Sequence, residues 1–534
     1  MYVILLLLLS GLLFGCVKRQ EKDPYTLNVS LDSEPPTLDW NYVSEATSNF
    51  CIRNLMDGLV SYDWSGPEVQ SKPALAESWE ISQNDLVYTF HLRKGMKWSD
   101  GVELTSQHFV DSWRRLADPK IASSYAYYLM PIKNWEKVTK GKLPPSEIGV
   151  EAPDPYTLKV TLEKPRSYFL DMLTYSVTYP IRLDVIQNHG EKWTEPGNIV
   201  TLGPFTLKKW EHDKRIVFER NENYWDKKPF LKTINVPFVS EISTTLNLFE
   251  TEQLDILLAL PMMELERYQK DPKLKSLLQS GPLFSITYFG FNTKKPPFDN
   301  PFVRKAFSAA INRKELLSVI RRNYYPITSW IPVKMFGYNP NIGIPFNPEK
   351  AREYLQNAGY EQREGNWVNK KDGKPFPKIQ LAIDNSESLK VIAENLQIQW
   401  KKHLGIEPEI ESKEFKVYVD TITQNPPHIW WYGWNADFPD PDTFMGVFIS
   451  DSNQNFTGWK NKEYDQLVEK AAMIPNSPKR KELYDKAQRI LLEQGVPFIP
   501  LYTRTYTLAT QPYIKNYTGS PIIDWRFDTV RIER

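Results

Sequence analysis

Hydrophobic and polar residues alternate along several short stretches in the first half of the chain. Between residues 86 and 93, and again between 156 and 162, every second residue is apolar. A period of two places the apolar side chains on one face of an extended strand. A shorter apolar run at 216–218 follows the turn-forming pair Gly203-Pro204. The pattern predicts strands of a sheet that buries one face.

In the second half of the chain, apolar residues recur at the spacing of a helix. Four segments carry an apolar stripe, and each begins at Asn or Ser, the residues that cap helix N-termini. Pro follows the cap in three of them, and Gly ends three of them. The predicted helices lie at 300–311, 347–359, 386–405 and 477–495. A strand-like stretch at 406–410 follows the third.

The two kinds of element interleave without a fixed repeat. This arrangement predicts mixed α/β domains rather than a solenoid or a helix bundle. The Pro-rich segments 295–298 and 425–428 are too short for disordered tethers and predict turns or hinges. The length of 534 residues is enough for roughly three or four domain-sized units.

The chain begins with an apolar run that ends at Cys16. The run is too short to cross a bilayer as a mature helix, so it predicts a secretory signal and an exported protein. Residues 13–16 resemble the lipobox of bacterial lipoproteins, in which the cysteine is acylated. The resemblance implies a signal peptide at 1–15, a tether at 16–25, and a periplasmic or cell-surface protein held to a membrane by a lipid on Cys16. A membrane helix that is never cleaved is the alternative.

Composition narrows the class of partner. The 66 Lys and Arg residues balance the 65 Asp and Glu residues, whereas a nucleic-acid-binding face normally shows a basic excess, so we expect no nucleic acid partner. The 17 Trp and 28 Tyr residues supply stiff contact surface of mixed polarity. Cys51 is the only other cysteine, and we expect it to be a small buried hydrophobe.

Common catalytic and metal-binding motifs are missing from the sequence. It has no phosphate-binding Gly-rich loop, HExxH or GxSxG, and its six histidines never stand at metal-ligand spacing. We therefore expect no enzymatic activity, no metal and no cofactor.

One dense group of carboxylates, at 437–442, follows the aromatic segment 429–434. An Asp-Pro-rich stretch by itself predicts a turn, and its prolines and missing Gly and Glu argue against a calcium loop. The aromatic segment predicts a buried strand, so Asp437 would leave a strand end beside an aromatic wall. A carboxylate in such surroundings requires a cation.

Three motifs near the N-terminus carry a family resemblance. Residues 74–79 (ALAESW), 88–101 (YTFHLRKGMKWSDG) and 109–113 (FVDSW) resemble the oligopeptide- and dipeptide-binding proteins of ABC importers, the family 5 extracellular solute-binding proteins. Further similar segments, among them 433–437 (GWNAD), extend the resemblance over nearly the whole chain after residue 25.

The resemblance implies an α/β protein with a three-lobed periplasmic-binding-protein fold (type II, Venus-flytrap), mixed sheets and discontinuous domains. Two lobes close over the ligand and the third enlarges the pocket. Carried onto this chain, lobe I takes 26–56, 186–284 and 505–534, lobe II takes 57–185, and lobe III takes 285–504. The implied function is a monomeric binding protein that captures oligopeptides and delivers them to the membrane permease of an ABC importer.

The resemblance also implies a ligand site. Asp437 matches the family carboxylate that pairs with the peptide's α-ammonium, and Trp434 and Tyr125 match pocket aromatics. Gly433 and Asn435 lie where backbone groups bind an extended peptide like an added strand. Without the resemblance, core packing would be the favoured interpretation of Trp434 and Tyr125.

Some family positions carry other residues in this sequence. An acidic position near the N-terminal pocket is Ser44, with Glu45 and Ala46 beside it, and two pocket aromatics are Phe249 and Phe415. These residues are expected to line the ligand site, but with altered chemistry.

Residues expected at the C-terminal side of the ligand differ further from the family pattern. Two family arginines that meet this end of the peptide are Ile422 and Trp431 here, while Arg321, or the adjacent Arg322, matches a basic residue that can serve the ligand's carboxylate. Peptide length preference is therefore open. Ser285 and Asn435 stand at the two positions where cysteines form a disulfide in a relative that this chain resembles, so that disulfide is absent.

Two alternatives to peptide binding remain. The same fold could bind a non-peptide solute such as an oligosaccharide or a metal chelate, and the aromatic content suits sugar stacking. A secreted glycoside hydrolase would need two carboxylates at a fixed separation in one cleft.

Overall fold

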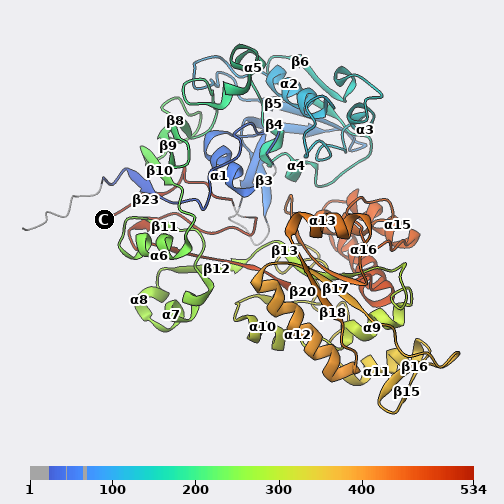
Figure 1. Ribbon diagram of the computed structural model, residues 1–534. Coiled ribbons are helices and arrows are strands. Elements are labelled where there is room, and N and C mark those ends of the chain that lie inside the picture. Colours follow the sequence, from blue (N-terminus) through green and yellow to red (C-terminus); the bar gives the residue numbers. More distant parts are fainter. Residues whose placement is uncertain (1–22, 44, 64–68, 523) are drawn as a thin grey trace, which may run out of the picture.

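The computed structural model describes residues 23–43, 45–63, 69–522 and 524–534. The predicted signal peptide, Cys16 and Ser44 lie outside these residues. Figure 1 shows three groups of elements, one around β4 and β5, one around β8–β10 and α6, and one around β13 and β17–β20. No helix in the described ranges is long and apolar enough to cross a membrane.

The first group is built on a four-stranded antiparallel sheet in the order β4-β5-β7-β6, with a β2–β3 hairpin beside it. Its strands are β2 (Val60–Asp63), β3 (Gln70–Pro73), β4 (Ala76–Ile81), β5 (Val87–Leu92), β6 (Val150–Asp154) and β7 (Thr157–Thr161). Its helices are α2 (Ser106–Ala117), α3 (Trp135–Thr139) and α4 (Phe169–Met172). Strands β5 and β7 confirm the two predicted from alternation, and alternate residues of β5 are buried.

The second group contains a four-stranded sheet, β1-β10-β9-β8, and a three-stranded sheet, β11-β21-β12. Its strands are β1 (Thr26–Asn28), β8 (Phe205–Glu211), β9 (Arg215–Arg220), β10 (Thr233–Pro237), β11 (Ile256–Leu257), β12 (Leu278–Pro282), β21 (Thr505–Thr510), β22 (Ile514–Lys515) and β23 (Arg531–Ile532). Its helices are α1 (Ala46–Leu55), α5 (Leu183–His189), α6 (Ile242–Glu250), α7 (Leu265–Lys270) and α8 (Pro272–Lys275). Strand β9 confirms the strand predicted at 216–218, and α5 runs across the predicted boundary between residues 185 and 186.

The third group contains a six-stranded mixed sheet in the order β14-β20-β13-β19-β17-β18. Its strands, with the β15–β16 hairpin, are β13 (Ser285–Phe291), β14 (Tyr325–Pro326), β15 (Tyr360–Arg363), β16 (Asn366–Asn369), β17 (Gln380–Asp384), β18 (Glu409–Lys413), β19 (Ile429–Asn435) and β20 (Phe498–Thr503). Its helices are α9 (Pro301–Ala309), α10 (Arg313–Ile320), α11 (Pro348–Asn357), α12 (Glu387–Leu404), α13 (Phe415–Gln424), α14 (Asp442–Met445), α15 (Lys462–Ala472) and α16 (Pro478–Arg489).

The four predicted helices form where their caps stand. Asn300, Asn347, Ser386 and Ser477 each accept a hydrogen bond from a backbone N–H in the first turn of α9, α11, α12 and α16. Two details differ from the prediction. Helix α16 passes into a π-helical turn at Ile490–Gly495, and the strand after α12 is Glu409–Lys413 rather than 406–410, because its register is set by pairing with β17.

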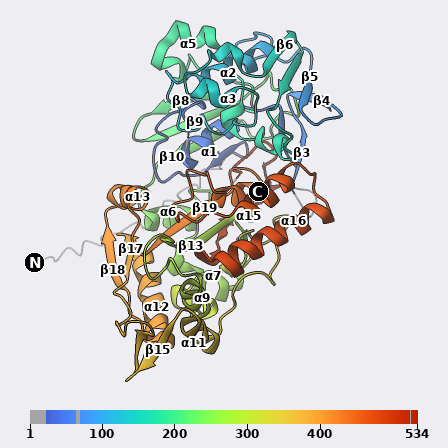
Figure 2. The ribbon, with the colours of Figure 1, turned by 90° about the vertical axis from the view of Figure 1, so that its right-hand side faces the viewer.

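The packing joins the first two groups in one core, to which the third group adds Phe438 and Ala472. One hydrophobic core contains buried residues of both the β4-β5-β7-β6 and the β1-β10-β9-β8 sheets. Cys51, on α1, is fully buried in this core, as predicted. Separate cores fill the third group. Figure 2 shows α15 and α16 on the side of the third group nearest the first two.

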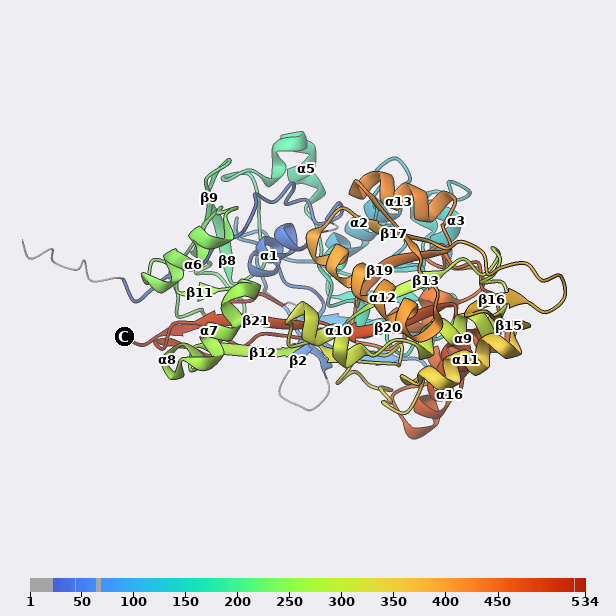
Figure 3. The ribbon, with the colours of Figure 1, turned by 60° about the horizontal axis from the view of Figure 1, so that its bottom comes forward.

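Two chain segments run side by side from the second group to the third, and we call this connection the crossing. Strand β12 leads into β13 and strand β20 leads into β21, and Figure 3 shows the red β20–β21 segment running alongside the green β12. At the crossing, the Leu283 N–H donates to the Arg504 carbonyl at 2.8 Å. A paired two-stranded connection of this kind can bend while its strands stay in register.

Candidate functional site

A cavity of about 220 Å³ lies at this crossing, where the three groups of elements meet. It contains five of the residues predicted for the ligand site, namely Glu45, Ala46, Tyr125, Asn435 and Asp437. They come from α1, from the loop before α3, and from the end of β19 and the loop after it. The fold therefore brings together residues that are up to 392 positions apart in the sequence, from 45 to 437.

Asp437 is the least compensated charge in this cavity. Its carboxylate forms no hydrogen bond or ion pair with any of the residues that the structure describes. Desolvation in the cavity raises the pKa of Asp437 to about 7. Since burial without a partner disfavours the charged form, a cation placed beside Asp437 would restore the carboxylate.

The backbone around Asp437 is held on both sides. The Asp437 N–H donates to the Thr443 hydroxyl at 3.1 Å, and the Tyr128 hydroxyl lies 3.4 Å from the Asp437 carbonyl oxygen. The next residue, Phe438, inserts into the core of the first two groups and stacks on Tyr168, with ring centroids 5.0 Å apart. Asp437 is thus fixed in position before any ligand arrives.

Tyrosines surround the Asp437 carboxylate. Tyr125 stacks on Tyr175 at 5.6 Å, and Tyr127 and Tyr128 lie within 5.3 Å of one or other of these rings. Burial, followed by the Asp437 charge, raises the pKa of Tyr125 and Tyr127. Aromatic faces beside a carboxylate form a favourable environment for an ammonium group. The predicted aromatic wall exists, but these tyrosines form it.

A buried ion pair closes the cavity on the other side. The Arg53 Nε donates to the Asp524 carboxylate at 2.8 Å, and both side chains are 9% exposed. Arg53 also donates to the Thr174 carbonyl at 2.9 Å and to the Tyr179 hydroxyl. Asp524 is therefore satisfied by the protein, in contrast to Asp437.

Helix α1 places Arg53 and uses Glu45 to do so. The Glu45 carboxylate accepts from the Thr47 N–H at 2.6 Å and the Ser48 N–H at 3.0 Å, which makes it the N-cap of α1. Gly203 packs so tightly against this helix that a Cβ there would lie 2.4 Å from the Met56 nitrogen. Glu45 lines the cavity as predicted, but its carboxylate serves the helix.

A second, larger cavity of about 790 Å³ lies between α7 and the third group. Two further predicted residues line it, Trp431 on β19 and Arg321 at the end of α10. Arg322 and Arg504 line it as well. We call it the arginine cavity. It reaches β19 at Trp431, whereas the Asp437 cavity reaches it at Asn435, and Arg504 lies between the two because it lines the arginine cavity and donates to Asn435.

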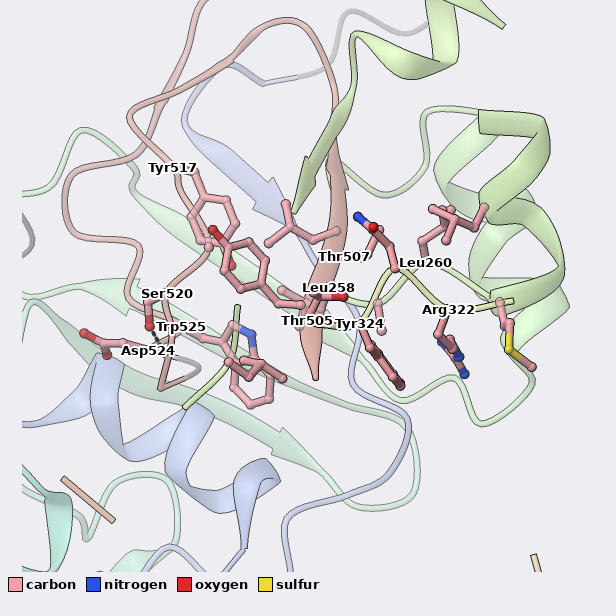
Figure 4. A pocket seen from close by; sticks show the side chains of 18 residues that line it. Leu258, Leu260, Arg322, Tyr324, Thr505, Thr507, Tyr517, Ser520, Asp524 and Trp525 are labelled. Atoms are coloured by element: carbon pink, nitrogen blue, oxygen red, sulfur yellow. Dashed lines mark hydrogen bonds between the residues drawn. The ribbon is translucent and has the colours of Figure 1, made fainter. Parts of the chain in front are cut away.

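A third cavity, of about 220 Å³, joins the other two. It shares Leu283 and Trp525 with the Asp437 cavity, and Arg322 and Tyr324 with the arginine cavity. Figure 4 shows Trp525 on one side of this cavity and Tyr324 and Arg322 on the other. Shared lining residues place the three cavities next to one another, and we call the three together the groove.

The edge of β19 lies open along this groove. Strand β13 pairs with the whole of β19, but β17 pairs only with Ile429 and Trp430. In the described part of the chain, no strand pairs with residues 431–435 on that second side. Unpaired backbone groups of this kind can take up an additional extended chain. Gly433 lies in the middle of the open edge.

Three predicted ligand residues lie elsewhere. Trp434 packs against the core that contains Tyr288 and Trp330, because it points to the opposite face of β19 from Asn435. Phe249 is 1% exposed inside a small core next to α7, so packing rather than a ligand occupies its ring. Phe415 is 58% exposed at the start of α13 and lines none of the three cavities.

The residues that replace the family disulfide are neighbours. Ser285 and Asn435 face each other across β13 and β19. Arg504 donates to both, with its Nε 3.3 Å from the Ser285 hydroxyl. Hydrogen bonds through one guanidinium thus connect the two strands at this point. Ile422, at a former arginine position, is fully buried in a core.

Sequence reasoning missed the cavity residues Arg53, Tyr62, Tyr175, Asp524 and Trp525. They come from four separate segments, and none stands in a motif that marks a ligand site. Predicting them would have required knowing that the C-terminal segment packs close to α1. Among the described residues, no group of three or more His, Cys, Asp or Glu side chains is placed to hold a metal ion.

Comparison with known proteins gives consistent matches. Residues 70–456 match the family described as bacterial extracellular solute-binding proteins, family 5 Middle. The chain is 32% identical over 517 residues to the periplasmic oligopeptide-binding protein OppA of Salmonella typhimurium, covering 95% of this chain and 92% of that protein. It is 31% identical over 494 residues to the probable deoxycholate-binding periplasmic protein YgiS of Escherichia coli, covering 91% of this chain and 89% of that protein.

Among solved structures, the chain is similar to the unliganded open form of the periplasmic murein tripeptide-binding protein MppA. The TM-score is 0.80 at 27% sequence identity, and the match covers 96% of this chain and 98% of that one.

Proposed function

The chain belongs to the bacterial extracellular solute-binding proteins of family 5, and we propose that it captures oligopeptides outside the cytoplasm and presents them to the permease of an ABC importer. The likeness to solved family structures confirms the predicted α/β periplasmic-binding fold. Oligopeptide binding is also what the name of the OppA relative gives.

The unpaired Asp437 carboxylate carries this proposal. It lies in a cavity lined by tyrosines at one end of the groove, next to an open strand edge. A peptide has the three groups that these features require: an α-ammonium for Asp437, an extended backbone for the open edge, and a chain that follows the groove. A buried carboxylate with no counter-ion is costly unless a ligand supplies the positive charge.

Closure of the groove would follow from the lobed arrangement. We assign lobe I to 26–56, 186–284 and 505–534, lobe II to 57–185, and lobe III to 285–504. The strands of each sheet all come from a single one of these sets, which supports the division. The α5 helix suggests that one boundary belongs at an end of that helix instead of between 185 and 186.

The same site favours a peptide over the other candidate ligands. One relative is named for deoxycholate, which carries no ammonium, and an oligosaccharide or metal chelate likewise offers no simple partner for Asp437. The relatives in the family are solute-binding proteins, and we assign no catalytic role to this chain. We propose that the protein works as an exported monomer and that an acyl group on Cys16 anchors it in a membrane.

The test is calorimetry with a free peptide and its N-acetylated twin. The free peptide should bind, and acetylation or the Asp437→Asn substitution should each weaken binding by about 3–5 kcal/mol, because each leaves one partner of a buried ion pair alone. The control is Asp420→Asn, which removes an exposed carboxylate on α13, outside the three cavities of the groove. Equal affinity for the free and acetylated peptides would rule out the ammonium site.

A further inference from the structure

A short segment just before α4 connects lobe II to lobe III through charged side chains. The Lys164 Nζ lies 2.8 Å from one oxygen of Glu469 on α15, and the Arg166 guanidinium donates to the other oxygen at 2.9 Å. The Ser167 N–H donates to the Ala472 carbonyl, also on α15, at 2.9 Å. Two cations of one lobe thus hold one carboxylate of the other. We call Lys164, Arg166 and Glu469 the clamp.

The clamp is partly shielded from water. The Arg166 side chain is 17% exposed and that of Glu469 is 36% exposed. Burial acts to raise the pKa of Glu469, but the hydrogen bonds and charges of Lys164 and Arg166 outweigh burial and lower this pKa. Glu469 is therefore ionised at neutral pH. Because attraction between charges is stronger where water is partly excluded, the clamp should bind more tightly than a fully exposed ion pair.

An aromatic contact lies next to the clamp and reaches the ligand site. Tyr168 stacks on Phe438 of lobe III, and both side chains are only 7% exposed. Phe438 and Ala472 are the residues that lobe III adds to the core of the other two lobes. Moving lobe III away from lobe II would expose these rings to water, which is unfavourable. Asp437 directly precedes Phe438, so the contact lies one residue from the ligand carboxylate.

The place of Asp437 in its cavity depends on this contact between lobes. Asp437 belongs to lobe III, whereas Tyr125 and Tyr175, which line the same cavity, belong to lobe II. The Tyr128 hydroxyl, also from lobe II, lies 3.4 Å from the Asp437 carbonyl oxygen. Separating the lobes would withdraw the carboxylate from its tyrosines. Glu469 lines none of the three cavities of the groove, so it can act on a ligand only through the lobe contact.

We propose that Glu469 is a positioning residue for ligand binding. By holding residues 164–168 of lobe II to α15, it keeps Asp437 against the lobe II tyrosines and slows the release of a bound peptide. The inference rests on the proposed peptide function and deepens it, because it names a residue outside the groove that sets how long the ligand stays bound. An ion pair between lobes also makes release depend on ionic strength.

The first experiment measures how fast tetra-alanine, labelled with a fluorophore on its C-terminal amide, enters and leaves the protein. Stopped-flow anisotropy gives both rates. Glu469→Gln should release the peptide about fivefold faster, the upper end for ion pairs that water still reaches, and should change the association rate by less than about twofold. Glu469→Asp keeps the charge and should restore part of the slow release. Glu482→Gln is the matched control and should change neither rate, because Glu482 pairs with Lys486 on α16, where the two are 64% and 59% exposed.

The possible outcomes separate the inference from the function on which it rests. Equal release rates for Glu469→Gln and the wild type would overturn the role of Glu469 and leave peptide binding intact. A slower association with unchanged release would overturn it too, since the clamp would then act on entry of the peptide. A wild type that binds no free peptide would overturn the proposed function, and the role of Glu469 in release with it.

The second experiment tests whether Glu469 acts through Arg166. Arg166→Gln should also speed release, and the double variant Arg166→Gln with Glu469→Gln should be no faster than Glu469→Gln alone, because both substitutions break the same pair. Independent effects that multiply in the double variant would overturn this pairing as the cause.

The third experiment varies salt. Raising the ionic strength from about 0.05 M to about 0.5 M should speed release from the wild type, and should have a clearly smaller effect on Glu469→Gln, because only the wild type has the pair that salt screens. Comparing the two proteins removes the salt dependence of the peptide's own charges. An equal effect of salt on both would overturn the electrostatic action of the clamp.

Discussion

Asp437 and Asp440 lie three residues apart in the loop after β19, and only Asp440 has a counter-ion from the protein. Arg480 donates to both Asp440 oxygens, at 2.6 Å and 2.9 Å, and the two side chains are 1% and 3% exposed. Arg480 also donates to the Ala471 carbonyl at 2.9 Å and lies 3.0 Å from the Tyr484 hydroxyl. In the ranges that the structure describes, no such partner stands beside Asp437.

The difference separates two uses of a buried carboxylate. Burial is the largest single effect and disfavours the charged Arg480, but the charge of Asp440, its hydrogen bond, and the nearby Tyr484 and Asp442 together outweigh burial and raise the pKa of Arg480. That ion pair is complete in the free protein, so it can only hold α16 to the loop. Asp437 is only half-buried and has no cation beside it among the described residues, and desolvation raises its pKa to about 7. The loop thus uses one acid for its own structure and presents the other to a ligand.

The largest effect should come from breaking the complete pair. Arg480→Met should lower the free energy of unfolding by about 3–5 kcal/mol, because it leaves Asp440 charged and buried without a counter-ion. Denaturant unfolding followed by circular dichroism measures this loss. Arg489→Met, on the same helix, is the matched control. Its pair with Glu493 is 46% and 31% exposed, so it should cost less than about 1 kcal/mol.

A double variant distinguishes the broken pair from lost packing. Arg480→Met combined with Asp440→Leu removes both charges and should recover most of the stability, since apolar replacements of buried ion pairs are often neutral. If the double variant is as unstable as Arg480→Met alone, the unpaired charge is not the cause.

Because Asp437 has no counter-ion among the described residues, peptide affinity should depend on pH. With a pKa of about 7, Asp437 is largely protonated in the free protein below pH 7. An ammonium beside it lowers that pKa, so peptide binding near pH 6 should release a proton and affinity should increase by up to about tenfold per unit between pH 5 and 7. Calorimetry in two buffers of different ionisation enthalpy measures the proton. A pH-independent affinity in this range would contradict the assignment.

The same shift has a consequence for stability. A carboxyl whose pKa is raised by folding stabilises the protonated protein, so its contribution is present at low pH and is lost as pH rises through about 7. Burial raises the pKa of Asp171 to about 7 and that of Asp442 to about 6, so these two carboxyls also make the free energy of unfolding depend on pH in this range. The difference between wild type and Asp437→Asn isolates Asp437, and this difference should shift in favour of the variant as pH increases from 5 to 8.

Much of the fold was predictable because its elements carry local patterns. The caps at Asn300, Asn347, Ser386 and Ser477 all form, and alternation located β5 and β7. The misplaced start of β18 shows the limit of this approach. Residues 406–410 have the same apolar character as a strand, but pairing with β17 decides which residues join the sheet.

The ligand site was predictable only in part. Asp437 was marked by the aromatic strand before it, which is a local signal. Tyr175 and Trp525 reach the cavity through tertiary packing, so their sequence neighbours say nothing about it. Trp434, predicted as a pocket aromatic, packs against a core on the opposite face of β19 from Asn435, because neighbouring residues of a strand face opposite sides. Its role in ligand binding stays a prediction.

Glu45 offers the finest test, since its carboxylate lines the same cavity as Asp437. It lines the Asp437 cavity, but its oxygens accept from the Thr47 and Ser48 N–H groups at the start of α1. Glu45→Gln should therefore lower the free energy of unfolding by about 1 kcal/mol or less, as loss of a helix cap does, and should leave peptide affinity nearly unchanged. Thermal unfolding and calorimetry on one preparation measure both. A loss of affinity as large as that of Asp437→Asn would mean that Glu45 also serves the ammonium, and that the cavity holds two ligand carboxylates.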